Sequence, residues 1–192
     1  MQYILPKKLK SFRQKFPNQK IEVIYANSDE GVKQLDSGAD IYITPLSFDF
    51  PNEHTIYPVV SFPIYLIAHK THPISKLKDI SLTDMAKYDI TLPSDDLSVF
   101  RGVKALMHSK GIDYEPKLSF RNWELMKSFV YEDLTMSIVT GLVLQAEDPE
   151  LFVYDMSDFF PPVSYGMLVP KFRTVPDYLQ AFIDSSITFD KK

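Results

Sequence analysis

The chain has 192 residues, of which 45% are hydrophobic and 24% are charged, so it is long enough for one large domain or two lobes with separate cores. Its formal net charge of -4 argues against a nucleic-acid-binding surface, because phosphate binding requires clustered lysines and arginines. It has no cysteine, which excludes disulfides and thiolate metal sites.

The N-terminus and the hydrophobic pattern bear on where the protein works. The first six residues lack the basic-then-apolar pattern of an export signal. No apolar run approaches the roughly 20 residues that cross a bilayer. We therefore expect a cytoplasmic protein with no membrane association.

The first predicted helix runs from Pro6 to Phe16, because proline suits a first helical turn and Pro17 stops the helix. Its apolar residues recur at helical spacing, so we interpret its lysines as a solvated face. Residues 20–26 (KIEVIYA) then alternate apolar and polar side chains, which predicts a strand.

The next segment predicts a helix followed by a second strand. Ser28 can cap the helix, Leu35 faces inward, and Gly38 is a plausible left-handed stop. Asp40 to Thr44 reads as a strand closed by a proline. The order strand, helix, strand predicts a parallel pair with a right-handed crossover.

The middle of the chain predicts further strands and helices in alternation. The stretch Thr55 to His69 contains two prolines, so it reads as two strands with a bend near Phe62 and Pro63. Later helices are predicted at residues 81–87, with Ser81 as the N-cap, at 97–110, after the N-cap Asn122, and at 176–187. Strands are predicted at 89–92, 117–121, 135–140, 151–155 and 163–169. This alternation predicts an α/β fold with helices on both faces of mostly parallel sheets.

Two predicted crossings, near residues 62 and 163, divide the chain into lobes. The first lobe would hold residues 1–62 together with 163–192, and the second lobe residues 63–162.

Residues that carry catalysis or bind metal are not recognisable in this sequence. The histidines lack the spacing of a metal set, and we interpret them as ordinary surface residues: His54, His69, His72 and His108. Adjacent carboxylates at loops and helix ends are typical of solvated positions rather than of acid–base pairs. Phosphate-binding glycine motifs and nucleophile motifs are also missing from the sequence. We predict no catalytic residue, no metal and no cofactor.

Small polar residues stand at several predicted strand-to-helix junctions, where α/β sheets bind ligands beyond the carboxyl ends of strands. A helix N-terminus there offers free N–H groups to an anion, and a hydroxyl can complete the shell. The alternative is that each residue only caps its helix. The residues are Ser28, Thr44, Ser94, Asp95 and Thr135.

An ordered series of motifs resembles the effector-binding (substrate-binding) domain of LysR-type transcriptional regulators. The series comprises Phe12-x-x-x-Phe16-Pro17, the strand KIEVIYA, Leu35-x-x-Gly38-x-Asp40-Ile41-x-Ile43, Thr71-His72-Pro73-Ile74, Ser81-Leu82-Thr83-Asp84-Met85 and the strand TMSIVT. The resemblance covers nearly the whole chain in order.

The resemblance implies a fold similar to type 2 periplasmic binding proteins, with two Rossmann-like lobes joined by two crossover strands. It implies a small-molecule effector in the inter-lobe cleft, contacted by Ser28, Thr44, Ser94, Asp95 and Thr135, and a homodimer. The family's helix-turn-helix domain does not occur in this sequence, so direct nucleic-acid binding is not expected.

The sequence departs from the family pattern at two places. Tyr3-Ile4-Leu5-Pro6 already matches the family's first helix, so we expect the strand that normally precedes it to be missing here: either the chain is a fragment or its sheet is completed in an unusual way. The family's G-x-G before the late strand is replaced by Asp133-Leu134-Thr135. We expect the carboxylates of Glu132, Asp133 and Asp95-Asp96 to disfavour an anionic effector.

Three other functions remain as alternatives. A solute-binding protein of a transport system would share the fold but carry an export signal. An enzyme on a similar two-lobed scaffold would bring catalytic groups together. A truncated remnant would only dimerise or bind partner proteins.

Overall fold

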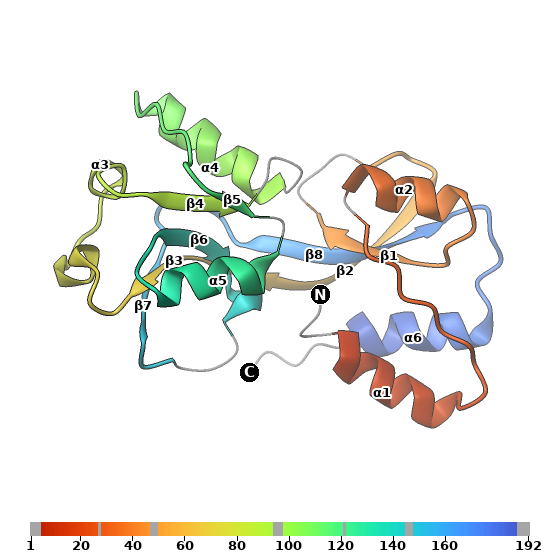
Figure 1. The fold of residues 1–192 in the computed structure, drawn as a ribbon. Helices are drawn as coiled ribbons and strands as arrows, with labels where there is room; N and C mark the ends of the chain where they lie inside the picture. The colour runs from red at the N-terminus through yellow and green to blue at the C-terminus, as the bar shows by residue number, and fades with distance from the viewer. Residues whose placement is uncertain are drawn as a thin grey trace. The chain divides into compact units, whose positions relative to one another are not determined.

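The computed structural model describes residues 5–26, 28–46, 50–93, 98–120, 122–144 and 148–187. The chain divides into two compact units. Unit 1 comprises Met1–Ser61 and Ser164–Lys192, and unit 2 comprises Phe62–Val163. Each unit has its own β-sheet, and the chain passes between them twice (Figure 1).

Unit 1 contains a three-stranded sheet in the order β1-β8-β2. Its strands are β1 (Tyr42–Pro45), β8 (Val163–Pro170) and β2 (His54–Phe62). Strands β1 and β8 are antiparallel, with Tyr42 opposite Leu168 and Thr44 opposite Gly166. Strand β1 therefore lies at one edge of this sheet.

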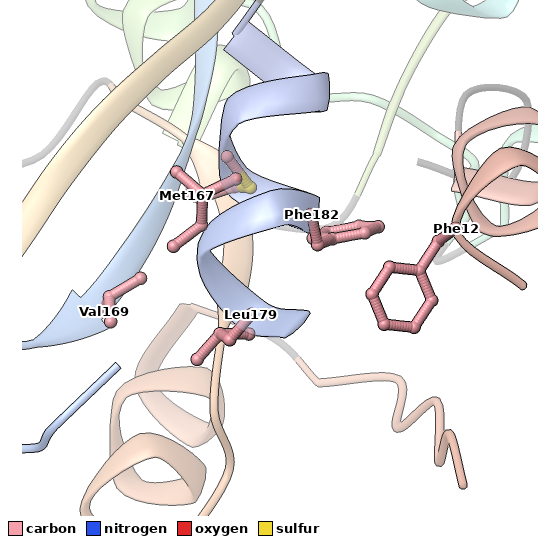
Figure 2. Close-up of a cluster of buried hydrophobic side chains, with 6 residues drawn as sticks. Phe12, Met167, Val169, Leu179 and Phe182 are labelled. Carbon is pink, nitrogen blue, oxygen red and sulfur yellow. The ribbon is translucent and has the colours of Figure 1, made fainter. Parts of the chain in front are cut away.

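Helices cover both faces of the unit 1 sheet. Helices α1 (Leu5–Lys15) and α6 (Asp177–Ile187) lie side by side and enclose a core with strand β8 (Figures 1 and 2). The rings of Phe12 and Phe182 meet edge to face, with centroids 5.6 Å apart. Ile41 and Ile43 pack against that core, whereas helix α2 (Ser28–Asp36) lies against Tyr42, whose side chain alternates to the opposite face.

The predicted strand over residues 20–26 is wrong. These residues are assigned to neither a strand nor a helix, and none of them has a hydrogen bond in the part of the chain that the structure describes. Val23, Ile24 and Tyr25 are 63%, 54% and 86% exposed. The predicted parallel pair is also wrong, because a strand forms only against a neighbouring edge, and β1 uses the antiparallel edge of β8 instead.

Unit 2 contains a five-stranded sheet in the order β5-β4-β6-β3-β7. Its strands are β3 (Ile64–His69), β4 (Ile90–Pro93), β5 (Ser119–Phe120), β6 (Met136–Thr140) and β7 (Leu151–Asp155). Strand β4 is parallel to β5 and β6, but β3 is antiparallel to β6 and β7. The expectation of mostly parallel sheets is therefore wrong, because apolar periodicity marks a strand without fixing its direction.

Helix α5 (Trp123–Tyr131) packs on this sheet and forms its core with Ile67, Met126, Val130, Val139 and Val143. The remaining helices are η1 (Pro73–Lys76), α3 (Leu82–Met85), α4 (Ser98–Ser109) and η2 (Gly141–Val143). The caps predicted at Ser81 and Asn122 are confirmed. Ser81 forms a capping box with Asp84, and Asn122 Oδ1 accepts from Glu124 N at 2.8 Å and Leu125 N at 3.1 Å.

The predicted fold class, an α/β chain in two lobes joined by two crossover strands, is confirmed. The predicted bend is also confirmed, since β2 ends at Phe62 and β3 begins at Ile64. In the residues that the structure describes, no helix has the length and apolar content that a membrane crossing requires.

Candidate functional site

Thr44 carries a buried hydroxyl that has no hydrogen-bond partner. The residue is 1% exposed, and its Oγ1 is among the buried polar atoms without a partner in the described structure. Such an atom costs about 1–3 kcal/mol if nothing satisfies it. Thr44 shares its face of β1 with Tyr42, which is the face that α2 covers.

Gly166 stands opposite Thr44 in the neighbouring strand β8. A glycine at this position puts no side chain beside the threonine hydroxyl. Ser28 is the first residue of α2, so the helix covering this face begins at another predicted site residue. The structure thus places Thr44 and the helix of Ser28 on the same face of unit 1.

Ser94 and Asp95, predicted to contact a ligand, lie outside the described residues. The strand that precedes them is described, and β4 ends at Pro93. They follow the carboxyl end of a strand in sequence, where ligand sites in α/β sheets are found.

Thr135 lies at the opposite end of the same sheet region. Met136 pairs with Ile90 and Ser137 with Thr91 in the parallel register of β6 and β4, so Thr135 stands at the amino ends of both strands. Its hydroxyl is 2.6 Å from Thr91 Oγ1 and 2.9 Å from the carbonyl oxygens of Asp89 and Met136, to either of which it can donate its one proton. These partners, all within unit 2, saturate the hydroxyl, and the residue is only 3% exposed.

Thr140 is a residue that sequence reasoning missed. It ends strand β6, is fully buried, and lies toward the same carboxyl edge at which β4 ends. The segment TMSIVT has a threonine at each end, and only its first threonine was chosen. The parallel direction of β4 and β6, which the sequence pattern did not fix, makes the second threonine a candidate because it stands at the carboxyl end of β6.

Asp133 adopts a left-handed backbone conformation with φ of 54° at the end of helix α5. Asp133 N donates to Val130 O at 3.0 Å, and Leu134 N donates to Phe129 O at 3.1 Å, which is the Schellman pattern of a helix end. Asp133, which stands where the family pattern has a glycine, therefore ends helix α5. Asp133 lies at the amino end of β6, away from the carboxyl ends at which a ligand is expected.

Two histidines that were expected at the surface are buried. His54 is 6% exposed, and its Nε2 lies 3.8 Å from Asp36 Oδ1. His72 is 9% exposed, packs edge-on against the ring of Tyr88 and caps η1 by accepting from Ile74 N at 3.2 Å. Burial lowers the pKa of His72, and the nearby Asp133 opposes that shift. Both histidines serve the packing of their units.

A metal site requires several ligand side chains close together in space. Among the described residues, no group of three or more histidines, aspartates or glutamates could hold a metal ion. The features present are two α/β units, two chain crossings and buried hydroxyls near strand ends. They are the features of the type 2 periplasmic-binding-protein fold class.

The chain belongs to the LysR substrate binding domain family, whose model matches residues 1–188. The transcriptional activator CmpR of Synechocystis sp. is 23% identical over 195 residues, a match that covers 98% of this chain and 63% of CmpR. The transcriptional regulator CysB of Haemophilus influenzae is 22% identical, with 95% of this chain and 57% of CysB covered. The chain therefore spans about three-fifths of the length of these relatives.

Solved structures show the same fold. The cofactor-binding domain of the Cbl transcriptional regulator superposes with a TM-score of 0.86 at 22% identity, covering 96% of this chain and 82% of that domain. The regulatory domain of CcmR from Synechocystis PCC6803, solved in complex with 2-PG, gives a TM-score of 0.83 at 19% identity. That match covers 97% of this chain and 90% of the CcmR chain.

Proposed function

We propose that this chain is the effector-sensing module of a LysR-type transcriptional regulator. It binds a small molecule, forms a homodimer in the cytoplasm and catalyses no reaction. DNA is bound by a helix-turn-helix domain outside these residues. The family match over residues 1–188 and the regulatory relatives support this assignment.

The lobes of this module are residues 1–62 with 163–192, and residues 63–162. The division of the chain into compact units at Ser61–Phe62 and Val163–Ser164 supports these boundaries.

The unpartnered hydroxyl of Thr44 is the observation that carries the binding proposal. An effector that hydrogen-bonds to Thr44 Oγ1 would satisfy a buried group at no further desolvation cost to the protein. Ser28, Ser94 and Asp95 complete the proposed contact set, to which the structure adds Thr140 as a new member. Thr135 is the member that the geometry supports least, because its hydroxyl is saturated.

The proposed mechanism is a shift of conformational population. An effector that binds one conformation of the chain better than another raises the population of that conformation according to the ratio of the two affinities. The bound state then changes the geometry that the dimer presents to its DNA-binding domains.

A thermal-shift screen of small metabolites against this chain tests the proposal. The CcmR regulatory domain was solved in complex with 2-PG, so 2-PG belongs in the screen beside anionic, neutral and cationic metabolites. We expect at least one compound to raise the melting temperature in a concentration-dependent way. A folded sample that no compound stabilises would contradict a sensing role.

Replacement of Thr44 by valine separates binding from folding. Thr44→Val removes the unsatisfied hydroxyl and keeps the side-chain shape, so the ligand-free chain should gain about 1 kcal/mol of unfolding free energy. The same variant should lose affinity for the effector found in the screen, measured by calorimetry. Thr55→Val, in strand β2 of the same unit, is the matched control and should keep wild-type affinity. Unchanged affinity of Thr44→Val would remove Thr44 from the site.

A further inference from the structure

The face of the unit 1 sheet that carries Thr44 has a gap in its rows of side chains at Gly166. Thr44 stands opposite Gly166 in the antiparallel ladder of β1 and β8. The ladder continues one residue beyond β1, because Leu46 N donates to Ser164 O at 2.7 Å. Side chains alternate along a strand, so Leu46 and Ser164 point to the same face as Thr44. Gly166 therefore leaves a space among three side chains.

The side chain of Leu46 fills that space. A Cβ on Gly166 would lie 2.8 Å from Leu46 Cδ1 and 2.9 Å from Leu46 Cδ2, so both methyl groups occupy the place of a side chain. Directly opposite residues of an antiparallel pair have Cβ positions about 5 Å apart, which brings these methyl groups beside Thr44. An apolar cover of this kind accounts for the buried hydroxyl of Thr44 that has no hydrogen-bond partner.

Leu46 can leave this space without disturbing the sheet. The residue is half-buried, and its methyl groups stand at the end of a side chain with two rotatable bonds. The other close neighbour of the space is the Tyr57 carbonyl oxygen, 2.8 Å from the same Cβ position, which belongs to the backbone and is fixed. The space above Gly166 therefore has one movable wall and one rigid wall.

Hydroxyl groups from two strands of this face border the space. Thr44 Oγ1 has no partner in the described structure, and Ser164 Oγ lies 2.8 Å from Ser61 Oγ. One hydrogen bond uses one of the two serine protons, so the pair keeps a proton and free lone pairs for a ligand. Hydroxyls both donate and accept, which matches an alcohol better than a carboxylate. Glu30, in the first turn of α2, offsets the positive helix dipole that attracts anions.

We propose that Leu46 is a gate residue of the effector site and that the site admits a neutral polyhydroxylated ligand, a polyol or a sugar. Without effector, the isobutyl group of Leu46 fills the space above Gly166. A hydroxyl of the ligand takes its place and hydrogen-bonds to Thr44 Oγ1 and Ser164 Oγ. This inference rests on the proposed function, and it adds Leu46 and Ser164 to the residues of the site.

A double-mutant cycle in the ligand-free chain tests whether Leu46 covers the Thr44 hydroxyl. Thr44→Val should raise the melting temperature of the wild-type chain, because it removes a buried hydroxyl that has no partner. In a Leu46→Ala chain, water reaches the hydroxyl and the same substitution should bring no gain. Ile43→Ala is the matched control, since Ile43 lies on the same strand but packs against the opposite core. Thr44→Val should keep its full gain there.

An equal gain from Thr44→Val in the Leu46→Ala and Ile43→Ala chains would overturn the gate. The cycle compares differences between variants, so it holds even if Leu46→Ala lowers the melting temperature by itself.

Binding of matched probes tests the ligand class. Glucose with glucuronate, and xylitol with xylonate, are pairs in which a carboxylate replaces one CH₂OH group. In saturation-transfer NMR we expect the neutral member of at least one pair to bind and its carboxylate counterpart to bind more weakly. Leu46→Ala should tighten that binding roughly threefold or more, because no side chain competes for the space, and Thr44→Val should abolish it. Binding of carboxylates alone, or of no probe to Leu46→Ala, would overturn the assigned class.

The metabolite screen separates this inference from the proposed function. A compound that stabilises the chain and binds Leu46→Ala, Ile43→Ala and wild type with equal affinity would overturn the gate and leave the sensing function standing. Absence of any stabilising compound would contradict the sensing function, whereas the double-mutant cycle reports on the Leu46 cover without any ligand.

Discussion

Gly166 in strand β8 occupies a position where any side chain meets fixed atoms. A Cβ there would lie 2.8 Å from the Tyr57 carbonyl oxygen and 2.8 Å from Leu46 Cδ1. The carbonyl belongs to the neighbouring strand and cannot rotate away. We expect Gly166→Ala to lower the unfolding free energy by about 1–3 kcal/mol, measured by urea denaturation.

Gly102 provides the control for that substitution. It lies inside helix α4, and a Cβ built there meets nothing within 4 Å. Gly102→Ala should therefore raise the unfolding free energy by about 0.5–1 kcal/mol through helix propensity alone. If the two variants changed stability in the same direction, the close approach at Gly166 would not be its cause.

Single residues show how far the sequence supports inference about the site. Ser81 and Asn122 were predicted as caps because a cap depends only on residues within three positions. Thr44 was chosen for its place after a predicted strand, but its unpartnered hydroxyl depends on packing between distant segments. Thr135 and Thr140 could not be ranked, since the choice requires the direction of β6 relative to β4.

At the scale of elements, Arg173 closes the C-terminal end of helix α2. Its guanidinium donates to the carbonyl oxygens of Leu35 at 2.9 Å and Ala39 at 3.0 Å. A cation there also complements the negative end of the helix dipole. We expect Arg173→Ala to cost about 0.5–1.5 kcal/mol of unfolding free energy. Arg173→Lys should recover part of it, because lysine keeps the charge without the planar fork. Wild-type stability of Arg173→Ala would show that the carbonyls are satisfied without it.

The capping box of helix α3 should make stability depend on acid pH. Hydrogen bonds from Lys87, and then from Ser81, lower the pKa of Asp84 from 3.8 to about 2. A carboxylate with a lowered pKa in the folded state stabilises the fold above the unfolded pKa, and that contribution is lost as pH falls. The difference in melting temperature between wild type and Asp84→Asn should therefore be constant above pH 5 and shrink between pH 4 and about 2. Lys87→Met should raise the lower limit of that pH window, because the Lys87 ammonium is the largest cause of the lowered pKa of Asp84 in the folded state.

Element boundaries follow local signals closely, but pairing does not. Strand β7 has the bounds that its apolar alternation predicts, and β2 and β3 separate at the predicted proline bend. Residues 20–26 have an equally strong alternating pattern and form no strand. The difference is a partner edge, which is supplied by residues far away in sequence or by another chain.

For the whole molecule, the rate of amide hydrogen exchange should be lowest where backbone hydrogen bonds are most numerous and highest where they are absent. Strand β3 has a ladder on each side, whereas residues 20–26 have none. Mass-spectrometric exchange on a dilute sample should show residues 20–26 deuterated within seconds and β3 protected longest. Early protection of that segment in monomer would contradict its open backbone.

The two passages of the chain between its units have a consequence for synthesis on the ribosome. Unit 2 is one continuous stretch, so it can fold as soon as it has emerged. Unit 1 cannot, because Phe12 packs against Phe182 of the last helix, and the central strand β8 also comes late. At translation rates of about 5–20 residues per second, the first helix waits on the order of ten seconds or more for its packing partner. Until then the apolar side chains of the first helix that this core buries, Leu9, Phe12 and Phe16, stay exposed on the nascent chain, where a chaperone can bind them.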